Sequence, residues 1–166
     1  MPHLSTGELL RDETTELGRS VKDILDRGDL VPDETMVELI RQHLTSANGG
    51  FVLDGFPRTM AQADALDEML AEIGRPLTIV FELQVPDGVA RERLLERSRV
   101  ESRSDDTPAG IDRRIELYHR ETEPIVQHYR VRGNLVGIHG TGTVDEVFAE
   151  IQEALEQVRG REETPA

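Results

Sequence analysis

The chain has 166 residues, of which 37% are hydrophobic and 4% aromatic, and it contains neither cysteine nor tryptophan. This length suffices for one domain with an aliphatic core, and the absence of cysteine excludes disulfides and cysteine-based metal sites. The formal net charge of −14 argues against nucleic acids and anionic membranes as partners. The first residues lack the features of a signal peptide, and no apolar run approaches the roughly 20 residues of a membrane helix, so we expect a cytoplasmic protein.

The first fifty residues are predicted to be mainly helical. Ser5-Thr6-Gly7-Glu8 has the spacing of a capping box and predicts a short helix that ends near Asp12. A second helix is expected over about 14–26, and Gly28 follows it. A third helix is predicted to begin at Asp33, because the apolar residues that follow share one helical face: Met36, Val37, Ile40 and Leu44.

The rest of the chain alternates short apolar strands with helices. The predicted strands are 51–53, 77–83 and 135–139. The predicted helices are 61–74, 87–97, 111–131 with a kink at Pro124, and one that begins with the capping box Thr143–Glu146. Such alternation is typical of a parallel sheet with helices on its faces.

Residues Asp54-Gly55-Phe56-Pro57-Arg58 connect the strand 51–53 to the helix that follows it. In parallel sheets, ligands bind beyond the carboxyl ends of the strands, and this junction lies there. Two interpretations remain open from these residues alone. The junction is either a ligand site or a turn in which Arg58 pairs with Asp54.

Arginine dominates the basic residues. Of the 19 lysines and arginines, only Lys22 is a lysine, and five arginines fall between residues 91 and 103. Guanidinium groups bind phosphate in a bidentate manner and stay charged, so this segment could gather phosphates. The alternative is a set of solvated helix faces. None of the five histidines has the spacing of a metal site.

Several motifs occur in a fixed order: LSTGELLR (4–11), GDLVPDE (28–34), GFVLDGFPRT (50–59) with Gln62, RERLLER (91–97), RSDD (103–106) and Arg114. Together they closely resemble the adenylate kinases, nucleoside-monophosphate kinases that make two ADP from ATP and AMP. The resemblance covers roughly residues 2–158. It implies an α/β fold of the P-loop-kinase type, with a parallel sheet flanked by helices. The implied organisation is one monomeric domain over 1–166, with an AMP-binding lobe at 5–31 and a short lid at 97–107.

The resemblance also implies an AMP site between the lobe and the strand–helix junction. Arg11 and Arg58 would bind the AMP phosphate, and Thr6 would lie near the adenine. Gln62 would hydrogen-bond the adenine edge. The remaining pocket residues would be Asp29, Leu30, Val31, Gly55, Phe56 and Pro57. Because Thr6 and Gln62 match the adenylate pattern, AMP is expected rather than a pyrimidine nucleotide.

The same resemblance places ATP and the transferred phosphoryl group. The catalytic residues would be Arg58, Arg97, Arg103 and Arg114, and the last two would also contact AMP. Arg93 and Arg97 would face the ATP phosphates, and Gly140-Thr141-Gly142 would offer backbone groups to the ATP adenine. Asp54 would hold a Mg²⁺ ion, which accompanies ATP, through water. No general base is needed, because the AMP phosphate is already ionised.

Structural interpretations of these residues also remain open. Thr6 could simply belong to a capped helix turn, and Gln62 could be an ordinary surface residue of a helix. Asp105 and Asp106 could stabilise the lid as partners of nearby arginines. Each of these readings predicts contacts within the protein rather than contacts with a nucleotide.

Two of the arginines have specific structural alternatives. Arg93 lies near Glu92 and Glu96 and could be solvated or ion-paired on the helix surface. Arg114 lies four residues before Tyr118 and could stack on that ring.

The 166 residues contain no Gly-x-x-x-x-Gly-Lys sequence, the loop that in this family follows a first apolar strand and cradles the ATP phosphates. We interpret Met1 as an internal start. In the family's fold the strand absent from these residues is the central one, so strands 51–53 and 78–83 would lose a shared neighbour. Three hypotheses follow. The chain is a truncated or mis-started adenylate kinase with little activity, an AMP-binding module that transfers no phosphate, or an interaction protein completed by another chain.

Overall fold

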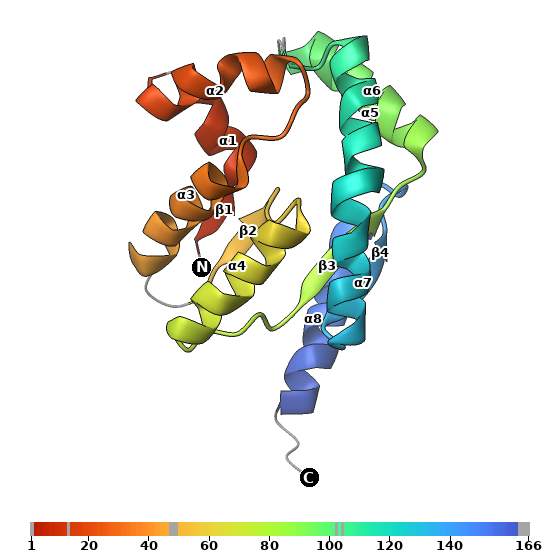
Figure 1. Cartoon of the computed structure of the whole chain (residues 1–166). Coiled ribbons are helices and arrows are strands. Elements are labelled where there is room, and N and C mark those ends of the chain that lie inside the picture. Colours follow the sequence, from red (N-terminus) through yellow and green to blue (C-terminus); the bar gives the residue numbers. More distant parts are fainter. Residues whose placement is uncertain (1, 13, 47–49, 102, 104, 163–166) are drawn as a thin grey trace.

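The computed structural model describes residues 2–12, 14–46, 50–101, 103 and 105–162. The first half of the chain forms one group of elements (Figure 1), whose bounds are β1 His3–Ser5, α1 Thr6–Arg11, α2 Glu16–Asp26, α3 Asp33–Ser46, β2 Val52–Asp54 and α4 Met60–Glu72. The second half contains β3 Val80–Gln84, α5 Asp87–Glu101, α6 Pro108–Leu117, a π-helical turn η1 Tyr118–Thr122, α7 Glu123–Val131, β4 Leu135–His139 and α8 Val144–Glu162. None of the described helices is long and apolar enough to cross a bilayer.

The strands form two separate parallel pairs. β1 pairs with β2, and β3 pairs with β4 in a register that places Val80 opposite Leu135. The predicted parallel arrangement is therefore confirmed, and the strand 135–139 has the predicted bounds. The strand predicted over 77–83 is observed as Val80–Gln84, because β4 begins opposite Val80 and no described strand pairs with residues 77–79. The short strand β1 was not predicted.

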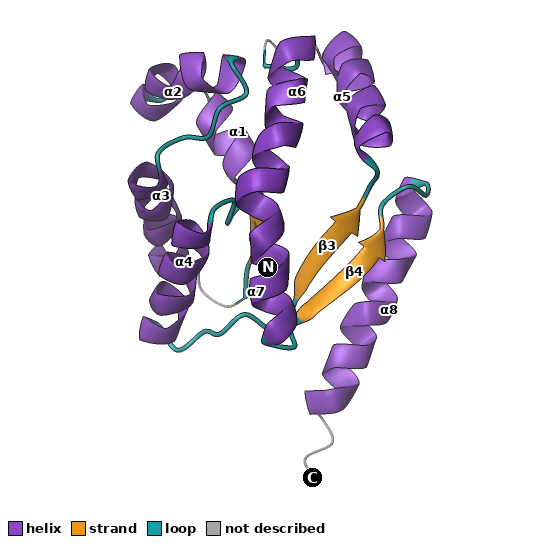
Figure 2. Cartoon of the chain, turned by 45° about the vertical axis from the view of Figure 1, so that its right-hand side comes forward, coloured by secondary structure: helices purple, strands orange, loops and turns teal. Residues whose placement is uncertain are grey.

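Helix α4 joins the two halves of the chain. Leu66, Met69 and Leu70 pack with buried residues of α1, α2 and α3, whereas Ala63 packs against Ile125 and Tyr129 of α7. In the second half, α7 and α8 lie on either side of the β3–β4 pair (Figure 2). The helices thus cover the sheet faces, as the alternating pattern predicts.

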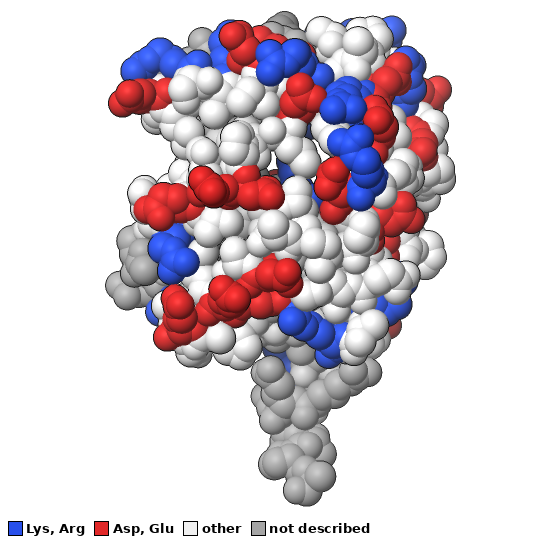
Figure 3. Space-filling model, in the orientation of Figure 1, with Lys and Arg blue, Asp and Glu red and all other residues white. Residues whose placement is uncertain are grey.

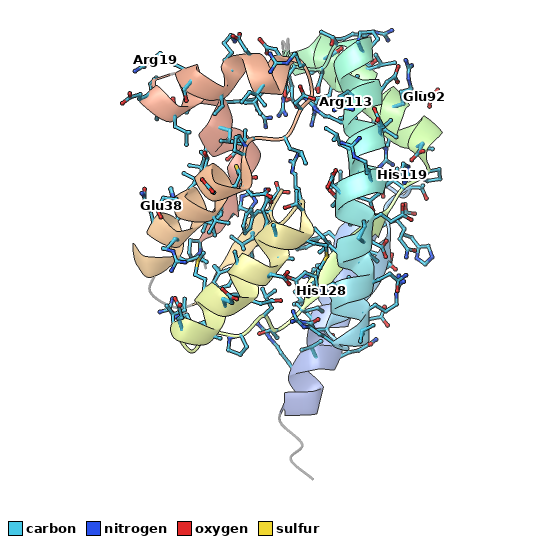
Figure 4. All side chains as sticks on the ribbon, viewed as in Figure 1. Arg19, Glu38, Glu92, Arg113, His119 and His128 are labelled. Carbon is cyan, nitrogen blue, oxygen red and sulfur yellow. The ribbon has the colours of Figure 1, made fainter. Side chains whose placement is uncertain are left out.

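Hydrogen bonds and an ion pair to Asp67 reinforce the contact between α4 and α7. His128 and Tyr129 both bond to the carboxylate of Asp67, at 2.9 and 3.4 Å, and Arg132 pairs with it as well. His128 points from α7 toward α4 in Figure 4. Burial, with a smaller contribution from Asp64, raises the pKa of the Tyr129 hydroxyl to about 12.

The two predicted capping boxes have different outcomes. Thr143 and Glu146 cap each other reciprocally, with 2.7 Å from the Thr143 N–H to Glu146 Oε2 and 3.3 Å from the Glu146 N–H to Thr143 Oγ1. The prediction of a capping box at Ser5 is wrong, because the Ser5 side chain makes no capping bond. Its hydroxyl donates to Asp54 at 3.4 Å. Ser5 lies opposite Asp54 in the β1–β2 ladder, so the strand partner is the nearer acceptor.

The helix predicted over 111–131 is interrupted. It begins at Pro108, where Thr107 Oγ1 accepts from the Gly110 N–H, and the π-helical turn η1 directly precedes Glu123 and Pro124. Proline cannot donate to the preceding turn, and a π turn is one way in which a helix accommodates such a break. The Thr122 hydroxyl instead donates to the Arg58 carbonyl at 2.8 Å, which ties this turn to the junction after β2.

Candidate active site

The junction after β2 is a tight turn that requires glycine. Gly55 has a φ of +78°, and a Cβ atom there would lie 2.7 Å from Thr6 Oγ1 and 3.0 Å from an Arg58 guanidinium nitrogen. Thr6 is 1% exposed, and its hydroxyl donates to the Asp54 carbonyl at 3.1 Å. The start of α1 is therefore fixed directly against the end of β2, with Arg58 beside it.

Arg58 is held by its own turn and by a buried amide. Its Nε donates to the Gly55 carbonyl at 2.9 Å, and its backbone N–H donates to Gln62 Oε1 at 2.8 Å. Among the described contacts, the Arg58 guanidinium makes no ion pair with Asp54, so the simple Asp–Arg turn is not what the structure contains. The side chain instead remains accessible to a ligand at the carboxyl end of β2.

Gln62 is buried, which excludes its interpretation as an ordinary surface residue of a helix. It is 2% exposed, and its Nε2 donates to Asp33 Oδ1 at 2.8 Å. The Thr59 hydroxyl donates to the same oxygen at 2.9 Å. Asp33 was predicted to begin a helix and is the first residue of α3, but no sequence pattern indicated that it would orient Gln62. Hydrogen bonding of Gln62 to an adenine stays a prediction.

Three arginines from three helices meet at two buried aspartates. Arg97 of α5 forms a bidentate pair with Asp106, with N–O distances of 2.6 and 2.8 Å. Arg114 of α6 bonds to the carboxylates of both aspartates at 2.5 and 2.6 Å, and Arg11 of α1 reaches Asp105 at 3.4 Å. Asp105 and Asp106 are each 3% exposed. The interpretation of these aspartates as arginine partners is confirmed.

The pKa shifts at this pair show which interaction dominates. Burial alone would raise the pKa of Asp106, but hydrogen bonds from Arg97 and Arg114 outweigh it and hold that pKa below its usual value. The same hydrogen bond to Asp106 raises the pKa of Arg97. Asp106 and Arg97 are therefore both charged, and hydrogen bonding between them stabilises both charges.

The arginines also act on one another. Burial lowers the pKa of Arg11, and the charges of Arg103, Arg97 and Arg114 lower it further. Arg58 lies in an open cleft whose walls partly desolvate its guanidinium, and this desolvation lowers its pKa, with added effects of Arg114 and Arg11. Mutual repulsion of this kind means that a multivalent anion bound between these five groups would be stabilised.

This positive cluster stands out in an acidic molecule. Figure 3 shows acidic side chains in bands over α3 and α4, and mixed charges over α6. We define the arginine cluster as Arg11, Arg58, Arg97, Arg103 and Arg114. The carboxylates that pair with its members are Asp105, Asp106 and Glu101, the last bonded to Arg103 at 2.5 Å. With Asp54, whose charge acts on Arg58, four carboxylates thus lie near five guanidinium groups, which leaves a local excess of positive charge.

The comparisons with known proteins agree with this geometry. The sequence profile of the adenylate kinase family matches residues 1–134. The chain belongs to the adenylate kinase family. An adenylate kinase of Thermus thermophilus is 47% identical over 155 residues, which are 92% of this chain and 82% of that relative. Adenylate kinases of Micrococcus luteus and Xanthomonas campestris are 44% and 41% identical over 161 and 160 residues, covering 94% and 93% of this chain and 78% and 86% of those relatives.

On the side that the adenylate kinase resemblance assigns to ATP, α5 contacts the turn after β4. Arg93 donates to the carbonyl of Gly140 at 2.5 Å and to that of Gly142 at 3.5 Å. The alternative of pairing with Glu92 or Glu96 is therefore not what the structure contains. The structure brings Arg93 and the 140–142 turn together, although contacts of either with ATP stay predictions.

The second structural alternative is also wrong. The Tyr118 ring makes its edge-to-face contact with His119, at a centroid distance of 5.4 Å, whereas the Arg114 guanidinium bonds to the two aspartates. The spacing of an arginine four residues before a tyrosine left a stack open as an alternative, but two carboxylates offer stronger, charge-assisted partners.

The predicted AMP lobe rests on α6. Gly28 has a φ of +75°, and a Cβ there would lie 2.3 Å from the Gly110 carbonyl oxygen. Arg113 of α6, labelled in Figure 4, donates to Asp29 at 3.0 Å, and with Arg27 it holds the pKa of Asp29 below its usual value. Val31 is buried, and residues 102 and 104 of the predicted lid lie outside the described residues.

Asp54 is the residue predicted to contact Mg²⁺ through water. Its side chain is 66% exposed at the carboxyl end of β2, where Ser5 bonds to it, His3 lies 3.8 Å away and its charge acts on the Arg58 guanidinium. The described residues contain no cluster of three or more potential metal ligands. A single exposed carboxylate fits Mg²⁺ that is bound mainly by water and substrate phosphates, which is its usual coordination in such enzymes.

Proposed function

We propose that this chain carries the AMP-binding and phosphoryl-transfer residues of an enzyme that transfers a phosphoryl group between ATP and AMP to give two ADP. The observation that carries the proposal is the arginine cluster, which converges from α1, the junction after β2, α5, the segment before α6, and α6 itself. Transfer between two polyanions requires that their phosphates approach in line, and fixed positive groups offset the repulsion and the spreading charge.

Arg58 and Arg11 are the proposed ligands of the AMP phosphate. Both are partly desolvated, and both carry neighbouring positive charge, so a dianion between them relieves repulsion as well as forming hydrogen bonds. Each charge-assisted hydrogen bond contributes about 1.5–3 kcal/mol. Thr6 and Gln62, with Asp29, Leu30 and Val31, are the proposed surroundings of the adenine.

Arg97, Arg103 and Arg114 are the proposed ligands of the phosphoryl group in transit. Asp106 bonds to Arg97, and Asp105 and Asp106 both bond to Arg114, which fixes the orientations of the two guanidinium groups. Nitrogens that do not bond to the aspartates remain available for phosphate oxygens, since each guanidinium has five N–H donors. The aspartates are thus positioning residues for the arginines.

Mg²⁺ bound with ATP would supply charge compensation between the donor phosphates. Asp54 is the proposed contact, through water. Arg93 and the 140–142 turn are the proposed surroundings of the ATP nucleotide, where the chain's own backbone groups orient the base.

The second candidate function is an AMP-binding module without transfer. It is favoured by the absence of a Gly-x-x-x-x-Gly-Lys sequence from the 166 residues, since backbone N–H groups of such a loop orient the donor phosphates. A coupled ADP-production assay on the chain fused to a strand–loop–helix segment of this family, run beside calorimetric titration of AMP, separates the two. ATP-dependent ADP formation by the fused chain supports the kinase, whereas AMP binding without turnover supports the module. Failure to bind AMP contradicts both.

A further inference from the structure

Three charged pairs join α5 to the segment that runs from α6 into η1. They follow one another along these antiparallel elements: Arg97 with Asp106, Arg91 with Asp112 at 2.7 and 3.3 Å, and Asp87 with His119 at 2.9 and 3.0 Å. The first two pairs contain arginine, whose charge does not change near neutral pH. The third contains histidine, which titrates in this range. The start of α5 is therefore held by the pair whose charge depends on pH.

The His119 ring lies between two carboxylates. Its Nδ1 is 2.9 Å from Glu123 Oε2, and its Nε2 is 2.9 and 3.0 Å from the two Asp87 oxygens. An ionised carboxylate only accepts hydrogen bonds, and a neutral imidazole has one N–H donor and a lone pair on its other nitrogen. A neutral ring would therefore turn a lone pair toward one of the carboxylates. Only the imidazolium form, with an N–H group on each nitrogen, donates to Glu123 and Asp87 together.

The two carboxylates belong to different elements. Glu123 is four residues after His119 and is the first residue of α7, so its bond is local. Asp87 is 32 positions away and is the first residue of α5. The His119 side chain is 46% exposed at the molecular surface (Figure 4). The bond to Asp87 is thus the one that connects separate elements, and water can replace it when the ring loses its charge.

The charges around the ring favour its protonated form. Hydrogen bonds to Glu123 and Asp87 raise the pKa of His119 above its usual value. Tyr118 contacts the ring edge-to-face and stays neutral, because burial, with the charge of Glu82 of β3 as the next cause, raises the pKa of its hydroxyl. The arginines of the adjoining turns are paired with other carboxylates, Arg91 with Asp112 and Arg120 with Glu121 and Glu116.

We propose that His119 is a pH-dependent link that holds the start of α5 to η1 as the imidazolium and releases it as the neutral imidazole. Because the folded pKa lies above the unfolded value of about 6.5, the link is complete below the unfolded pKa and is lost as the pH rises through the folded pKa. Above that range, only the pairs of Arg91 and Arg97 remain of the three, so the first turn of α5 opens more often.

Proton NMR titration of the histidine rings in the whole 166-residue chain, between about pH 5 and 9, tests the protonation step. His119→Gln identifies the His119 resonance by its loss. Asp87→Asn and Glu123→Gln should each lower the pKa of His119, because each replaces a charged acceptor by a neutral amide. Glu92→Gln is the matched control, because Glu92 is an exposed carboxylate of α5 (Figure 4) with no described contact to the ring, and it should leave the pKa of His119 unchanged.

Amide hydrogen exchange tests the release of α5. The Ala90 N–H donates to the Pro86 carbonyl at 2.9 Å in the first turn of α5 and reports the opening of this turn. After correction for the intrinsic effect of pH on exchange, Ala90 should exchange about two- to fivefold faster above the titration of His119 than below it, the size expected for an exposed pair. In His119→Gln this pH response should disappear. A purely structural role of Asp87 at the helix N-terminus would give no such response, since carboxylates are ionised throughout this range.

Two results would overturn the proposal. One is a pKa of His119 that is the same in the unmodified chain and in Asp87→Asn, and the other is a pH response of Ala90 that is absent from the unmodified chain or persists in His119→Gln. The substituted side chains of His119, Asp87 and Glu123 are 46%, 59% and 59% exposed, so we expect the variants to fold. If one does not, the response of Ala90 in the unmodified chain still decides. No readout uses a nucleotide, so failure here leaves the proposed phosphoryl transfer untouched, and failure of that transfer leaves this link untouched.

Discussion

Replacing Asp106 by asparagine should destabilise the protein by removing the shared partner of two arginines. The Asp106 side chain has no exposed surface and accepts three hydrogen bonds, two from Arg97 and one from Arg114. Breaking a buried ion pair by removing one partner costs about 3–5 kcal/mol. Because 31% of the Arg97 side chain and 22% of the Arg114 side chain stay exposed, we expect the lower end, about 3 kcal/mol.

Urea unfolding followed by circular dichroism measures this change, and thermal unfolding should show a melting temperature lower by about 6–12 °C. Asp112→Asn, on the adjoining helix α6, is the matched control, because its pair with Arg91 is exposed, and it should leave the urea midpoint unchanged. An Asp106→Asn variant as stable as the unmodified chain would refute the argument that this carboxylate holds the two arginines.

The same variant has a pH signature with a defined sign. The pKa of Asp106 is lower in the folded state than its usual value, so its stabilising contribution is fully present above the unfolded pKa of about 3.9. That contribution is lost as the pH falls through the lower folded pKa. The difference in unfolding free energy between the unmodified chain and Asp106→Asn should therefore be constant near neutral pH and shrink in acid. A difference that grows on acidification would contradict the assignment.

The remaining predictions concern nucleotide binding and turnover. Arg58→Ala should weaken AMP binding by about 1.5–3 kcal/mol, measured by calorimetry. Equal affinities of the unmodified chain for AMP, UMP and CMP would contradict the roles given to Thr6 and Gln62. A bisubstrate analogue that joins two adenosines through a phosphate chain should protect residues 98–107 from protease, and cleavage at an unchanged rate under saturation would count against a closing lid. The 166-residue chain alone should form little ADP, since loss of one oriented donor costs about 10²–10³ in rate, and fusion to a strand–loop–helix segment of this family should restore turnover. Robust turnover without the fusion would show that the account of ATP binding is wrong.

Local features of the fold followed from the sequence alone. The strand 135–139 and the reciprocal cap of Thr143 and Glu146 were predicted because their determinants lie within a few consecutive residues. The sequence motifs also indicated the family, since several of them occur together in one order, and the family profile confirmed it. The separation of β2 from β3 was expected from the lack of a shared neighbour, and the two strand pairs confirm it.

Contacts between distant segments were decided only by the tertiary structure. Ser5 has the spacing of a cap, yet its side chain makes no capping bond and its hydroxyl donates to Asp54, which the pairing of β1 with β2 places opposite it. Arg11 and Asp105 are 94 positions apart, and only the packing of the predicted AMP lobe against α6 brings them together. Side-chain charge and local spacing are properties of neighbouring residues, whereas the partner that satisfies a buried charge depends on which elements pack against it.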